Sequence, residues 1–140
     1  MPGEDSRAKG GSPWIAHGTA LLWTAFVVVC LLLPGTVIQP VDEGFLSLLP
    51  SEIDKLVHGL LFFFETFYLL RSFRHLRPGL PALPAAIAAA LFLGALTEIL
   101  QLWVPHRDGS GADWIADALG AFACGAWVSR PDRTGTRSTS

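Results

Sequence analysis

Four apolar runs, separated by segments that contain Pro, Gly and most of the charges, dominate the chain: residues 14–33, 56–70, 84–104 and 114–128. The first and third are about 20 residues long, which as α-helix matches the roughly 30 Å hydrocarbon layer of a membrane. The other two have 15 residues each. The fourth is short for a lipid-exposed span unless its polar start is buried among other helices. The pattern predicts an all-α fold, an integral membrane bundle of four transmembrane helices.

Composition agrees with a membrane protein. Hydrophobic residues make up 51% of the chain and charged residues 16%, whereas soluble proteins carry roughly a quarter charged residues. This disfavours a disordered chain, a nucleic-acid binder or a soluble enzyme. The length of 140 residues leaves room for one domain. We expect it at residues 13–129, between disordered cytoplasmic tails at 1–12 and 130–140.

The basic residues predict the orientation of the helices, because cytoplasmic loops of membrane proteins collect Lys and Arg. When the four runs alternate in direction, eight of the ten basic residues fall on one side: Arg7, Lys9, Arg71, Arg74, Arg77, Arg130, Arg133 and Arg137. Only Lys55 and Arg107 fall on the other side. Both termini are therefore expected in the cytoplasm, and the protein in the plasma (inner) membrane as a multi-pass protein.

Ionisable residues inside spans are expensive, so each one is a candidate functional residue. On the second helix, Asp54, His58 and Glu65 lie within about 40° of one another at ~100° per residue. On the fourth, Asp113 and Asp117 are four residues apart and share a face. The sequence thus predicts polar stripes on separate helices.

These stripes come to the same depth, because the start of the second helix, the end of the third and the start of the fourth all lie in the outer half of the membrane. We therefore expect a shared, outward-facing polar cleft. Its predicted ligand-binding residues are Asp54, Lys55, His58, Glu98, Gln101, Arg107, Asp113 and Asp117. Arg107 lies in the loop between the third and fourth helices.

The chain resembles the VanZ-like family of small bacterial membrane proteins in the order and spacing of Asp54-Lys55-x-x-His58, Glu98-x-x-Gln101, Arg107 and Asp113-x-x-x-Asp117-x-x-Gly120. The resemblance covers about residues 50–128. The family pattern more often has Asn where this chain has Asp117. The resemblance implies a multi-span protein of the cell envelope, in a family named for reduced susceptibility to the glycopeptide teicoplanin. It does not imply an established reaction.

Counting charges constrains what the cleft can hold. Its four carboxyl groups give four negative charges when ionised, whereas Lys55 and Arg107 give only two positive charges. The carboxyl groups are those of Asp54, Glu98, Asp113 and Asp117, and Glu65 is expected deeper in the membrane. Burial and like-charged neighbours both disfavour full ionisation. At least one carboxyl is therefore expected to be protonated, or His58 to be cationic, or a cation to bind.

Several functions fit these residues. The cleft could bind a membrane lipid head group, a lipid-linked wall precursor or a peptide terminus, with Lys55 and Arg107 on a phosphate or carboxylate. An acid–base enzyme would use His58 or Glu98 as the catalytic base, although no G-x-S-x-G nucleophile motif is present. The residues could instead form a purely structural interhelical network.

Three further interpretations concern metals, ions and assembly. A metal would use His58 with Asp113, Asp117 or Glu98, but no H-x-x-x-H or close Cys pair supports one, so the sequence predicts neither a metal nor another cofactor. A proton or ion pathway is disfavoured, because Glu65 is its only candidate in the deeper half. A homodimer with a shared channel is an alternative that the sequence leaves undecided. No nucleic-acid partner is expected.

Overall fold

The computed structural model describes residues 12–33, 51–76, 81–105 and 109–130. These form helices α1 (Pro13–Leu32), α4 (Ser51–Leu76), α5 (Ala82–Gln101) and α6 (Gly111–Val128). No strand occurs in the described ranges, and the all-α prediction is confirmed for them. The predicted tails at 1–12 and 130–140, apart from Ser12 and Arg130, and the predicted site residue Arg107 lie outside the described residues.

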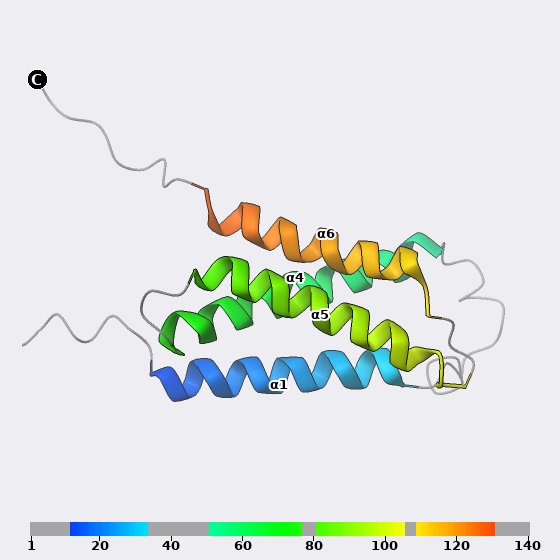
Figure 1. The fold of residues 1–140 in the computed structure, drawn as a ribbon, viewed down its shortest axis with the longest axis horizontal. Helices are drawn as coiled ribbons and strands as arrows, with labels where there is room; N and C mark the ends of the chain where they lie inside the picture. Colours follow the sequence, from blue (N-terminus) through cyan, green and yellow to red (C-terminus); the bar gives the residue numbers. More distant parts are fainter. Residues whose placement is uncertain (1–11, 34–50, 77–80, 106–108, 131–140) are drawn as a thin grey trace, which may run out of the picture.

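The helices run up and down as a bundle. Helices α4 and α5 lie between α1 and α6 (Figure 1), and each of these outer helices packs on both inner ones. The end of α1, the start of α4, the end of α5 and the start of α6 lie at the same end of the bundle (Figure 1). We call this the Gln101 end of the bundle, after the last residue of α5.

Within the described residues, three helices are long and apolar enough to cross a membrane: Pro13–Leu32, Ile53–Leu76 and Ala82–Gln101. Helix α6 has 18 residues and is not among them, because Asp113, Asp117 and its Gly residues lower its hydropathy. The described part of the chain is thus a bundle of four helices, three of which are long and apolar enough to cross a membrane. The crossing of α6 stays a prediction.

Helix α4 is longer than its apolar run. It extends over 26 residues, whereas the sequence predicted a span at 56–70. The additional turns carry polar and basic residues, such as Asp54 before the run and Arg71 and Arg74 after it. Apolarity therefore marks only the middle of this helix.

Small residues occupy the interior of the bundle and large apolar residues its surface. Ala86, Ala90 and Ala121 are fully buried, whereas Leu21 and Phe92 are each 72% exposed. Side chains of this size are normally removed from water in a soluble protein. Small interior residues and apolar exteriors are expected where lipid surrounds a bundle.

Candidate functional site

His58 and Asp117 form the centre of the polar cluster. His58 lies in the first half of α4 and Asp117 in the first half of α6. The His58 Nδ1 atom lies 3.0 Å from the Asp117 Oδ1 atom, and their side chains are 2% and 0% exposed. The hydrogen bond fixes the imidazole ring between the two helices.

Close approach of the two helix backbones makes this hydrogen bond possible. Gly59 follows His58 in the chain, and Gly120 lies three residues after Asp117. A Cβ atom on Gly120 would overlap the backbone of Gly59. Because neither residue carries a side chain, α4 and α6 touch here and bring the imidazole within reach of the carboxylate.

The second carboxylate oxygen of Asp117 faces α5. A Cβ atom on Gly94 would lie 3.0 Å from Oδ2 of Asp117, so this glycine leaves room for the carboxylate. Within the described part of the chain, Oδ2 is buried and has no hydrogen-bond partner. Asp117 is therefore enclosed by three helices, and among the described residues only its Oδ1 atom has a hydrogen-bond partner.

Glu98, in the last turn of α5, is 9% exposed. Its Oε2 atom accepts a hydrogen bond from the backbone N–H of Ser110, at 2.6 Å. Ser110 is the N-cap of α6, and its side chain accepts from the Ala112 N–H. The carboxylate therefore lies at the positive end of the α6 dipole. Its Oε1 atom is buried and has no partner among the described residues.

His58, Glu98 and Asp117 form one group, which we call the buried triad. Each offers one potential ligand atom, these atoms all lie within 4.8 Å of one another, and all three residues are buried. Among the described residues, no Lys or Arg is buried. The triad thus places two carboxyl groups and an imidazole in the interior, and no described Lys or Arg is buried with them.

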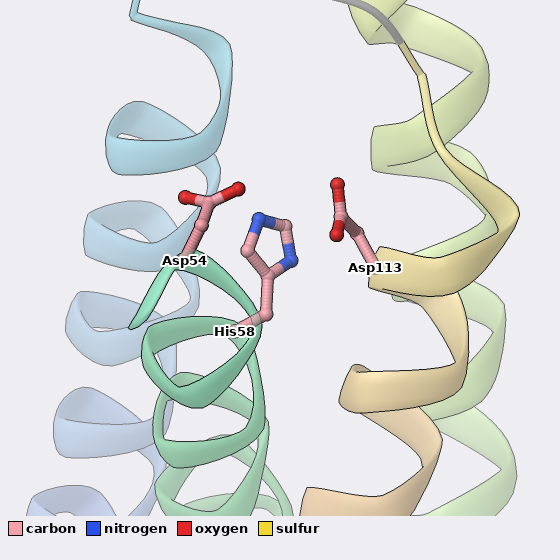
Figure 2. A group of neighbouring side chains, drawn as sticks. All are labelled: Asp54, His58 and Asp113. Carbon is pink, nitrogen blue, oxygen red and sulfur yellow. The ribbon is translucent and has the colours of Figure 1, made fainter. Parts of the chain in front are cut away.

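His58 also belongs to a second group that reaches the surface. Potential ligand atoms of Asp54, His58 and Asp113 lie within 4.8 Å of one another. Figure 2 shows the imidazole lying between the two carboxylates, one from α4 and one from α6. Asp54 is exposed and Asp113 half-buried, so His58 connects the buried triad to carboxylates that reach the surface.

The other predicted site residues lie differently. Lys55 is half-buried and lines an open groove of about 530 Å³ between α4 and α6, together with Leu56, Phe63 and Leu119. Gln101 is buried but turned to α1, where its Nε2 atom donates to the Leu31 carbonyl oxygen at 2.9 Å. Of the seven predicted residues that the structure describes, it therefore brings together five: Asp54, His58, Glu98, Asp113 and Asp117.

Ser110 was missed by the sequence reasoning. It holds Glu98 and helps to line a shallow pocket of about 280 Å³ with Leu102, Gly109 and Trp114. The signal was present, because Ser110-x-x-Asp113 has the spacing of an N-terminal capping box. Glu65, two turns further along α4, is a separate case: it is 1% exposed and accepts a hydrogen bond from Thr24 of α1 at 2.7 Å.

Comparison with known proteins identifies no relative, because no protein-family model, no curated protein and no solved structure matches the chain.

Proposed function

We propose that the chain is a VanZ-like, multi-pass protein of the plasma membrane, with four crossing helices and both termini in the cytoplasm. In this arrangement the Gln101 end faces outward. The polar group at that end, which consists of Asp54, His58, Glu98, Asp113 and Asp117, binds an extracytoplasmic ligand. This ligand is a lipid head group, a lipid-linked wall precursor or a similar molecule. The family resemblance extends the proposal to the cell envelope and to reduced susceptibility to teicoplanin.

One observation carries the binding proposal: ionisable side chains from α4, α5 and α6 meet at the same end of the bundle. Packing alone can be achieved with Ser, Thr and small residues, which are less costly to remove from water than carboxyl groups. Ionisable groups inside a membrane bundle commonly mark a ligand or ion site. A binding site therefore explains this convergence better than packing does.

The side chains of α6 support its crossing. Its buried residues are small or polar, among them Ala116, Asp117 and Gly120. Ile115, Leu119 and Phe122 are more than half exposed, at 56%, 66% and 55%. A helix that turns its large apolar side chains outward is stabilised by contact with lipid.

The groove between α4 and α6 favours a ligand that has an apolar tail. Its lining includes Leu60, Phe63 and Leu119, and Lys55, near the start of α4, lines it as well. An acyl chain along the groove would place an anionic head group beside this ammonium. A lipid or lipid-linked precursor matches both the polar and the apolar part of this surface.

The test is to purify the protein in detergent and identify by mass spectrometry the lipids that remain bound. We expect one lipid class to be enriched over the bulk membrane, and the enrichment to fall several-fold in His58→Ala. Gly18→Ala is the matched control, because a Cβ atom there meets nothing within 4 Å. Bulk lipid composition in the wild-type protein would contradict the proposal.

A second candidate is a membrane-embedded acid–base enzyme acting on a lipid-linked substrate. The observation that favours it is the His58–Asp117 hydrogen bond of 3.0 Å, because a buried carboxylate is a common device for orienting a catalytic imidazole. His58 would act as the base and Glu98 as a second acid–base group. Incubation with lipid-linked precursors should then yield a product of altered mass that is lost in His58→Ala, whereas unaltered precursor would exclude the reaction.

The same variants test the structural alternative. If the polar network serves only packing, Glu98→Gln and His58→Ala should lower the amount of protein in the membrane in step with any envelope phenotype. If it serves binding or catalysis, the phenotype should disappear while membrane levels stay normal. Immunoblots of membrane fractions measure the protein levels alongside teicoplanin susceptibility.

A further inference from the structure

The side chains of the buried triad have the composition of a metal site. An imidazole nitrogen and two carboxylates are ligands for Zn²⁺ and Mn²⁺. The three potential ligand atoms lie within 4.8 Å of one another and all three residues are buried. We propose that His58, Glu98 and Asp117 bind a divalent transition-metal cation of this class.

Two unused acceptors point to a cation independently of residue type. The Oε1 atom of Glu98 and the Oδ2 atom of Asp117 are buried without hydrogen-bond partners among the described residues. Glu98 is 9% exposed and Asp117 0%. Buried polar atoms normally have a partner, and a bound cation would give both oxygens one.

The geometry requires only a small contraction. Zn²⁺ binds nitrogen and oxygen ligands at about 2.0–2.2 Å, which places neighbouring ligands of one ion roughly 3.0–3.5 Å apart. The triad atoms are at most 4.8 Å apart, so side-chain movements of about 1 Å close the site. Three protein ligands would leave an open coordination position, as in metal sites that also bind water or another ligand.

Charge balance favours the same conclusion. Two ionised carboxylates in the interior are strongly disfavoured unless a positive charge accompanies them. No buried Lys or Arg is present among the described residues, and His58 can supply one charge at most. A divalent cation neutralises both carboxylates, and the competing explanation is that protons neutralise them.

No short metal motif marks this site in the sequence, because the ligands come from three separate helices. His58 is on α4, Glu98 on α5 and Asp117 on α6, so no short spacing connects them. The inference goes beyond the proposed ligand binding. It is tested with the metal ion alone, so its failure and that of the binding proposal are distinguishable.

The experiment uses the full chain in detergent, stripped with a chelator, incubated with ZnCl₂ or MnCl₂ and passed through a desalting column. Elemental mass spectrometry then counts the retained metal. We expect about one ion per wild-type chain and a higher thermal unfolding temperature with metal. The isosteric variants Asp117→Asn and Glu98→Gln should retain at least tenfold less metal.

Glu65→Gln is the matched control, because Glu65 is also buried, and its Oε2 atom has no hydrogen-bond partner in the described part of the chain, but it does not belong to the triad. It should retain as much metal as the wild type. Wild-type protein that keeps no ion and shows no thermal shift would overturn the proposal without reference to any variant. Infrared bands of protonated carboxyl groups that are lost in Asp117→Asn and unchanged by either metal would also overturn it, in favour of protons.

Discussion

Asp117 shows how one side chain can serve the interior of a membrane bundle in two ways. Its Oδ1 atom pairs with His58, and its Oδ2 atom faces Gly94 without a partner among the described residues. The first interaction needs only an acceptor oxygen, whereas metal binding needs the negative charge. Stability and binding can therefore be separated by substitution at this one position.

We expect Asp117→Asn to keep the free energy of unfolding within about 1 kcal/mol of the wild type when chelator is present, because the amide oxygen can still accept from His58. Asp117→Ala should lose about 1–3 kcal/mol, since it leaves the buried imidazole without its partner. Unfolding by steric trapping in bicelles measures both values. Equal losses for the two variants would show that the hydrogen bond is not what Asp117 contributes.

The sequence predicted which residues are polar inside the spans, but not where each side chain points. The predicted convergence of polar side chains from three helices is found for Asp54, His58, Glu98, Asp113 and Asp117. Gln101 was expected in the same cleft but bonds to Leu31 of α1. Helical periodicity gives the face of a helix, whereas the rotation of that helix against its neighbours depends on packing of the whole bundle.

At the level of elements, the contact between α4 and α6 positions the site. It depends on Gly59 and Gly120, where the backbones meet without side chains between them. Small residues let transmembrane helices approach closely. In lipid the hydrophobic effect does not drive helices together, so the packing contacts made at this short distance stabilise their association. Widening this contact should move His58 away from Asp117.

Gly120→Ala is therefore expected to destabilise the protein by about 1–3 kcal/mol, as over-packing of a tight interface does. It should also weaken metal retention. Gly18→Ala is the control, because its Cβ atom would meet nothing within 4 Å, and it should not destabilise the protein. The same steric-trapping measurement applies, and a Gly120→Ala protein as stable as the wild type would show that the helices do not depend on this contact.

Helix positions followed from the apolar runs more closely for some elements than for others. The runs at 14–33 and 114–128 differ from α1 (Pro13–Leu32) and α6 (Gly111–Val128) by at most three residues at either end. For α4 (Ser51–Leu76) the run at 56–70 covers only the middle, because the ends of this helix are polar and hydropathy does not register them. Hydropathy locates the part of a helix that suits lipid, and helix propensity and packing decide how far the helix continues.

For the whole molecule, the distribution of side chains is that of a bundle in lipid, and its tryptophans suggest two interfaces. Trp103 and Trp114 belong to the Gln101 end, and Trp14 and Trp127 to the opposite end. All four are exposed, between 39% and 83%. Tryptophan is enriched where membrane meets water, so these residues mark the expected boundaries of the bilayer.

The orientation of this bundle decides which solution the site meets. The excess of Lys and Arg predicts that the opposite end lies in the cytoplasm and that the Gln101 end faces outward. Only in that orientation can the polar group bind a wall precursor or an outer-leaflet head group. Orientation and the crossing of α6 are therefore tested together at the two ends of that helix.

The most direct measurement is thiol labelling in intact cells, using a chain in which Cys30 and Cys124 are replaced by Ala. Gly111→Cys and Arg130→Cys place single thiols at exposed positions on opposite ends of α6. A membrane-impermeant reagent should label residue 111 in intact cells and residue 130 only after permeabilisation. Labelling of both from the same side, or of residue 130 alone in intact cells, would contradict an outward-facing site on a crossing α6.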